Sequence, residues 1–180
     1  TNTNINNNSS GSKGGALYLS SNGNQLSMTE SNIRNSDAPS SGGAIWSDGH
    51  ISLNETLIDS SSSGSQGGAI FTDAYKQVEL HNSSVTNSYA SHQGGGLWIG
   101  NNSKVYAVNS HIDNNISNSQ GGGIYFEHNA NDTLILEQSS INNNISTNEG
   151  GGVYIYDTDD YTYVTGFESS INGNNSGAYN

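Results

Sequence analysis

The chain has 180 residues, of which 31% are hydrophobic and 11% are charged, and its formal net charge is −12 with only four Lys and Arg residues. Nucleic-acid binding requires a basic surface, so this charge balance excludes that class of partner and also disfavours anionic membranes. The sequence has no cysteine and no apolar run of 18 residues, which excludes disulfides, thiolate metal sites and a membrane-spanning helix.

A short phrase recurs along the chain: two glycines, a small residue, an aliphatic residue and an aromatic residue. Its six copies begin at Gly14, Gly42, Gly67, Gly94, Gly121 and Gly150. Successive copies are 25–29 residues apart, and self-similarity at such a period is the signature of a repeat architecture. We expect one repeat domain over residues 1–180. Because the sequence starts and stops inside a repeat, we also expect it to be a fragment of a longer repeat protein.

Each period contains three short apolar segments with the period-two alternation of strands that have one buried face. The first segment is the phrase, and the second is an alternating pair such as Ile51-x-Leu53 or Val78-x-Leu80. The third is centred on one aliphatic residue, namely Ile5, Ile33, Ile58, Val85, Ile112, Ile141 or Ile171. Three strands per period predict an all-β fold, a parallel β-helix (solenoid) of about six coils of 25–29 residues. With one strand spacing per coil, the rod is roughly 30 Å long.

Polar residues flank the aliphatic residue of the third segment at fixed distances. Ser or Thr stands two residues before it, as in Ser31 and Ser83. Asn stands two residues after it, at Asn7, Asn35, Asn87, Asn114 and Asn143. Residues at −2, 0 and +2 of a strand share one face. We therefore expect the Ser/Thr column and a structural Asn column to point inward and to bond one another from coil to coil.

These residues resemble a known pattern. The succession Ser140-Ile141-Asn142-Asn143-Asn144, followed by the phrase that begins at Gly150, resembles the repeats of the chlamydial polymorphic outer membrane proteins. It is similar as well to adhesin-like surface proteins of bacteria and archaea. The resemblance covers essentially the whole chain. It implies a right-handed, single-stranded parallel β-helix and a secreted or surface-displayed adhesin, and it supplies no catalytic residues.

The aromatic residues at the ends of the phrases form the main candidate binding site. They are Tyr18, Trp46, Phe71, Trp98, Tyr125 and Tyr154. If the preceding aliphatic residues point inward, these rings point outward, beside a strip of small residues such as Ala44 and Gly96. An exposed aromatic strip suits a glycan or a protein ligand. Two alternatives stay open: the rings stack on one another beneath loops, or they belong to the core.

Carboxylates offer weaker candidates. Asp48 and Asp73 occupy equivalent positions in adjacent coils, as a glycosidase pair or a Ca²⁺ site would require, although solubility explains them more simply. We expect no cofactor, with Ca²⁺ as the one alternative, at Asp157, Asp159 and Asp160. The five histidines fall at five different repeat positions, which argues against a metal site.

The uniform repeat and the absence of a catalytic cluster predict a structural and adhesive segment of an extracellular or cell-surface protein that is not an enzyme. The expected partner is a glycan or protein on a host or neighbouring cell, bound through the aromatic column or the long loops. One alternative is a fragment of a carbohydrate-active enzyme, either a polysaccharide lyase or a glycosidase. Another is a building block of an extracellular filament that self-associates end to end. We expect no nucleic-acid partner and no membrane insertion.

Overall fold

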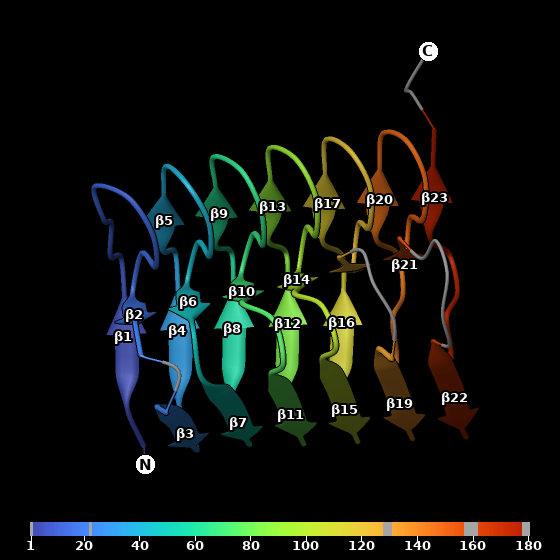
Figure 1. Ribbon diagram of the computed structural model, residues 1–180, viewed down its shortest axis with the longest axis horizontal. Helices are drawn as coiled ribbons and strands as arrows, with labels where there is room; N and C mark the ends of the chain where they lie inside the picture. Colours follow the sequence, from blue (N-terminus) through green and yellow to red (C-terminus); the bar gives the residue numbers. More distant parts are fainter. Residues whose placement is uncertain (1, 22, 128–130, 157–161, 178–180) are drawn as a thin grey trace.

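A computed structural model describes residues 2–21, 23–127, 131–156 and 162–177. Within these ranges the chain contains only strands, turns and loops, and every strand pairing is parallel. Equivalent strands of successive coils lie side by side along a rod (Figure 1). The solenoid predicted from the sequence is therefore confirmed. No helix long and apolar enough to cross a membrane occurs in the described residues.

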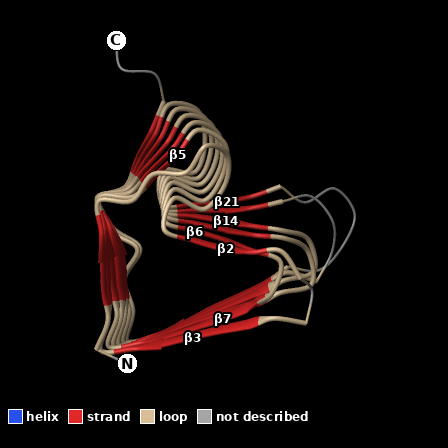
Figure 2. Ribbon diagram, turned by 90° about the vertical axis from the view of Figure 1, so that its left-hand side faces the viewer, coloured by secondary structure: helices blue, strands red, loops and turns tan. Residues whose placement is uncertain are grey.

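Four sheets run along the described part of the rod, three with six strands and one with five (Figure 2). The phrase sheet contains β2 (Leu17–Leu19), β6 (Ile45–Ser47), β10 (Ile70–Thr72), β14 (Leu97–Ile99), β18 (Ile124–Phe126) and β21 (Val153–Ile155). The long-strand sheet contains β3 (Gln25–Thr29), β7 (His50–Asn54), β11 (Gln77–His81), β15 (Lys104–Val108), β19 (Thr133–Glu137) and β22 (Tyr163–Phe167).

The third sheet contains β1 (Asn4–Asn6), β4 (Asn32–Arg34), β8 (Leu57–Asp59), β12 (Ser84–Thr86) and β16 (His111–Asp113). A fourth, short-strand sheet was not predicted, because its two-residue strands carry no clear alternation. It contains β5 (Asp37–Ala38), β9 (Ser62–Ser63), β13 (Tyr89–Ala90), β17 (Ile116–Ser117), β20 (Ile145–Ser146) and β23 (Asn175–Ser176).

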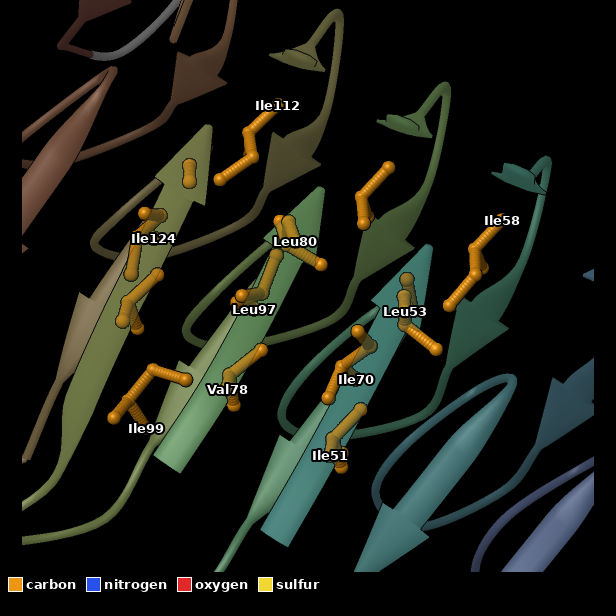
Figure 3. Close-up of a cluster of buried hydrophobic side chains, with 14 of the residues drawn as sticks. Ile51, Leu53, Ile58, Ile70, Val78, Leu80, Leu97, Ile99, Ile112 and Ile124 are labelled. Carbon is orange, nitrogen blue, oxygen red and sulfur yellow. The ribbon is translucent and has the colours of Figure 1, made fainter. Parts of the chain in front are cut away.

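The core is a set of aliphatic columns that pass up the inside of the rod (Figure 3). Ile45, Ile70 and Leu97 of the phrase sheet lie directly above one another and are fully buried. The aliphatic residues of the long-strand sheet and the third sheet complete the same cluster. Each coil alone is too thin to bury these side chains, so the stack of neighbouring coils creates the core.

The paired glycines form a corner that no other residue fits. The first glycine of each phrase has a φ angle of 60–69°, a conformation that residues with a Cβ rarely adopt. A Cβ on the second glycine, for example Gly43, would overlap the carbonyl oxygens of Gly68 and Ser62. The phrase is therefore fixed by the turn and by the close approach of the next coil.

The inward Ser/Thr column is confirmed. Ser83 and Ser110 are fully buried, and each hydroxyl donates to the carbonyl two residues earlier. Each also accepts a backbone N–H from the preceding coil; for example, Ser83 N–H donates to Ser110 Oγ at 3.1 Å. The hydroxyl thus has both a hydrogen-bond acceptor and a donor within the protein. The Ser/Thr column therefore satisfies the polar groups of the turn that follows the long-strand sheet.

The predicted inward orientation of the Asn column is wrong. Asn7, Asn35, Asn87, Asn114 and Asn143 are all exposed, with φ angles of 51–60°. A left-handed residue turns the chain and ends the alternation of the strand before it, and Asn tolerates this conformation better than most residues. The column is structural as a set of outer corners, and Asn35 Nδ2 donates to Asn7 Oδ1 at 3.1 Å.

The residue after each corner points inward instead. We call this set the inner corner column: Ser36, Ser61, Ser88, Asn115, Asn144 and Asn174. The first five are at most 1% exposed. The strip of small residues predicted on the outer face is also inside, because Ala44 and Ala69 are buried in the core. A Cβ on Gly96 would lie 3.0 Å from Asn115 Nδ2. The strip is thus small because it lies against the inner corner column of the next coil.

Candidate functional site

The six aromatic residues of the phrases form one continuous stack on the outer side of the phrase sheet. Adjacent ring centroids are 4.3–6.2 Å apart, and adjacent ring planes are within 28° of parallel. The closest pair is Phe71 and Trp98. Parallel pairing places each ring over its equivalent in the next coil, as in Trp46, Phe71 and Trp98. The rings thus stabilise the coil stack by contact with one another.

Half of this stack is closed to a ligand. Trp46, Trp98 and Tyr125 are at most 8% exposed, whereas Tyr18 at the amino-terminal end is 53% exposed. The loops between the short-strand sheet and the phrase sheet curve over the outer side of the phrase strands (Figure 2). From one of these loops Lys13 places its Nζ 4.5 Å from the Trp46 ring centroid. This geometry favours stacking beneath loops, and ligand binding by the column stays a prediction.

Burial within the aromatic stack raises the pKa of one tyrosine. The pKa of the Tyr125 hydroxyl is raised from 10.0 to about 12, chiefly because burial disfavours the phenolate. The neighbouring Tyr154, Glu127 and Tyr156 add to this effect. Tyr125 therefore remains protonated at neutral pH and acts as a packed ring rather than as an acid or base.

The two carboxylates considered as a glycosidase pair are both engaged with the protein. Asp48 Oδ1 lies 3.1 Å from Nζ of Lys76, whose side chain is only 4% exposed. Asp73 Oδ1 accepts the backbone N–H of Ala74 at 2.8 Å, an ordinary turn contact. The first carboxylate lies beside a buried cation, and the second accepts a hydrogen bond within a turn.

The acidic residues proposed for Ca²⁺, Asp157, Asp159 and Asp160, lie outside the described residues. Within the described ranges, no group of three or more His, Cys, Asp or Glu side chains is arranged to hold a metal ion.

A polar cluster on the outer face of the third sheet was not predicted from the sequence. His111 Nδ1 lies 2.7 Å from Ser140 Oγ, which lies 2.9 Å from Asp113 Oδ2. Serine stands between carboxylate and imidazole here, so its proton goes to Asp113 and not to the histidine, unlike the order in a catalytic triad. Asp113 Oδ1 also accepts the Asn142 N–H at 2.7 Å. The cluster therefore replaces backbone pairing where the third sheet ends.

A second missed feature is a hollow of about 120 Å³ on the outer face of the long-strand sheet. It is lined by Gln25, His50, Ile51, Ser52, Gln77 and Glu79. The residues come from β3, β7 and β11, and their side chains stand on neighbouring strands because the strands are in register. Equivalent repeat positions carry different residue types here, so only the three-dimensional register reveals the group.

Comparison with protein families supports the resemblance inferred from the sequence. Residues 2–20 and 109–127 match the model of the Chlamydia polymorphic membrane protein repeat. Each matched segment begins two residues before a third-sheet strand and ends two residues after a phrase. The two segments make up well under half of the chain, so the match identifies a type of repeat. It also supports, coarsely, a cell-surface location. No curated protein and no solved structure matches the chain.

Proposed function

We propose that this chain is a rigid β-helical segment of a surface-displayed adhesive protein. The observation that carries the proposal is the unbroken parallel register of the coils in the phrase sheet and the long-strand sheet. The match to a repeat of surface-associated membrane proteins supports the same interpretation. A rod of this kind holds its outer faces at a fixed spacing and orientation, which suits contact with another cell.

The rod is stiff because neighbouring coils are joined at every level. Backbone hydrogen bonds join equivalent strands, and they continue through the turns, as from Gly68 N–H to the Gly94 carbonyl at 2.9 Å. The aliphatic columns and the aromatic stack add continuous apolar contact on both sides of the phrase sheet. Bending the rod would break several of these contacts at once, so the segment keeps its two ends at a fixed distance and orientation.

Labelling of intact cells tests the proposal. Antibodies against this segment should bind unpermeabilised cells that express the full-length protein, and external protease should remove the signal. Beads coated with the segment should adhere to host or neighbouring cells more than beads coated with a heat-unfolded sample. Labelling that requires permeabilised cells would contradict surface display, and equal adhesion of both bead types would contradict an adhesive role of the fold.

A further inference from the structure

The hollow on the long-strand sheet lies where the pairing of two strands is interrupted. The β3–β7 ladder begins at Gln25 and His50, and the β11–β15 ladder begins at Gln77 and Lys104. The β7–β11 ladder begins one residue later, at Ile51 and Val78. The Gln77 N–H donates to His50 Nδ1 at 3.0 Å. The His50 imidazole thus accepts a backbone N–H at the point where the ladder between the two strands begins. This hydrogen bond holds the ring at the edge of the hollow.

This contact fixes the hydrogen-bonding character of the histidine. Since Nδ1 accepts the Gln77 N–H, the neutral ring carries its proton on Nε2 and presents a donor. Gln77 Nε2 in turn donates to Glu79 Oε1, which orients the carboxylate on the same face. The hollow therefore combines an oriented donor with an oriented acceptor, beside the hydroxyl of Ser52 and the amide of Gln25.

Beyond the hollow the same face carries Lys104, the register partner of Gln77, and a run of apolar side chains. Tyr106 is the register partner of Glu79, and Ile135 is the partner of Tyr106. Farther along, Tyr163 is 59% exposed. The face thus passes from a polar hollow on β3, β7 and β11 to a half-buried tyrosine ring one strand away, about 4.8 Å.

We propose that this face of the long-strand sheet binds a neutral oligosaccharide. Sugar hydroxyls need paired donors and acceptors, which His50 and Glu79 supply. The apolar face of a sugar ring packs on an aromatic ring, which Tyr106 supplies one strand farther along. The net charge of −12 repels an acidic glycan. An extended peptide would need an open sheet edge, but β7 and β11 are paired on both sides.

The inference rests on the proposed function, because it assigns the adhesive contact of the rod to one face. It also moves that contact away from the aromatic column, in which three of the six rings are buried. Display on the cell and glycan binding are measured separately. If intact cells are labelled but no glycan binds, this inference fails and the surface rod stands.

The test begins with the folded segment on an array of neutral and acidic oligosaccharides, followed by calorimetric titration of the strongest neutral hit. Glu79→Ala and Tyr106→Ala should each weaken binding by roughly tenfold or more, as expected for loss of a hydrogen bond to a charged group or of a stacking ring. Tyr106→Trp should retain binding because it keeps a platform. This variant also separates loss of the ring from a fold defect, which thermal melting monitors.

Two control variants remove the same residue types from other faces. Glu55 is an exposed carboxylate at a corner, and Tyr89 is a partly exposed ring on the short-strand sheet. Glu55→Ala and Tyr89→Ala should bind the glycan as the unmodified segment does. The proposal is overturned if no neutral oligosaccharide binds, if acidic glycans are preferred, or if Glu79→Ala and Tyr106→Ala bind with unchanged affinity.

Discussion

Two groups of coils share one backbone and fill the same inner corner differently. We call the coils that contain Ala44 and Ala69 the Ser/Ala coils, because the repeat positions equivalent to Asn115 and Asn144 are Ser61 and Ser88 in the coils that follow these alanines. We call the coils that contain Gly96 and Gly123 the Asn/Gly coils, because Asn115 and Asn144 face them. Ala is found opposite Ser, and Gly is found opposite Asn. The volume of the small position therefore decreases where the volume of the polar side chain increases.

The two groups of coils also differ in whether the polar side chain at the inner corner has hydrogen-bond partners. The hydroxyls of Ser36 and Ser61 are buried with no hydrogen-bond partner in the described part of the chain. By contrast, Asn144 Oδ1 accepts the backbone N–H of Asn115, and Asn144 Nδ2 donates to the Ile112 carbonyl at 2.8 Å. The amide spans the space between coils, whereas the hydroxyls of Ser36 and Ser61 do not. Ser88 is intermediate, because its Oγ accepts the Ser61 N–H at 3.4 Å. A long polar side chain thus requires glycine beneath it to enter the corner.

The largest expected effect comes from removing one amide of the Asn/Gly coils. Asn144→Ala would leave the Asn115 N–H and the Ile112 carbonyl without these partners. It would also remove one of the two acceptors of the Asn115 amide, which keeps the Val85 carbonyl. At about 1–3 kcal/mol for each buried unsatisfied group, we expect a loss of roughly 3–5 kcal/mol. Ser61→Ala removes a hydroxyl with no partner, so we expect a change within about 0.5 kcal/mol. Urea unfolding of both variants provides the measurement, and equal losses would contradict the comparison.

A smaller effect is expected from filling the space that glycine leaves. A Cβ on Gly96 would lie 2.7 Å from the Gly123 carbonyl oxygen and 3.0 Å from Asn115 Nδ2. Gly96→Ala should therefore destabilise the rod by about 1–3 kcal/mol, as overpacking does. The double variant Gly96→Ala/Asn115→Ser converts one corner to the Ser/Ala type. Its loss of unfolding free energy should be smaller than the sum of the losses in the two single variants. A coupling free energy of about zero would show that the volumes of the two positions are not matched.

The sequence predicted the parts of this rod that obey simple alternation. The apolar pairs such as Val78 and Leu80, and the Ser/Thr column before the third segment, lie on straight strands where residues two apart share a face. The Asn column failed because Asn35 and its equivalents adopt positive φ angles, which ends the alternation at that residue. Counting across the corner therefore assigned the inward position to the wrong neighbour.

The binding site was harder to predict than the fold for a different reason. The aromatic residues repeat perfectly, but their burial depends on loops that pass over them, such as the one that carries Lys13. The hollow at His50 and Glu79 has no repeat at all, and it exists because one ladder bond is given to an imidazole. Periodicity identifies what every coil shares, whereas a site is a place where one coil differs from the others.

Alkaline pH should separate the two groups of coils. In the aromatic stack the Ser/Ala coils carry Trp46 and Phe71, which do not titrate, whereas the Asn/Gly coils include Tyr125 with its pKa raised to about 12. The folded state holds this proton more tightly than the unfolded chain, so the stabilisation is complete below pH 10.0 and is lost as the pH rises towards about 12. Hydrogen exchange should therefore show protection lost first around Tyr125.

Tyr125→Phe should remove most of this alkaline sensitivity, since the ring stays and the titrating hydroxyl goes. Tyr75→Phe is the matched control, because Tyr75 is 71% exposed. Melting temperatures of the two variants between pH 9 and 12 give the comparison, because this range begins about one pH unit below the ordinary tyrosine pKa of 10.0 and extends to the raised value. A Tyr125→Phe variant that loses stability as steeply as the control would contradict this account.

The smallest expected effect concerns a corner that both groups of coils share. The residue that follows each long strand has a φ angle of 47–50°, and it is Asn at Asn82 and Asn109 but Glu at Glu55 and Gln at Gln138. Left-handed backbone costs most L-residues about 1–2 kcal/mol, and Asn recovers part of that because its short side chain bonds locally. Glu55→Asn and Gln138→Asn should each stabilise the rod by roughly 0.5 kcal/mol in thermal or urea unfolding. The left-handed backbone is the same in both groups, so the gain should be equal apart from the exposed hydrogen bond from Gln138 Nε2 to Glu168 Oε2, which the shorter Asn would lose. Unequal gains would mean that the two groups differ in backbone strain as well as in how they fill the inner corner.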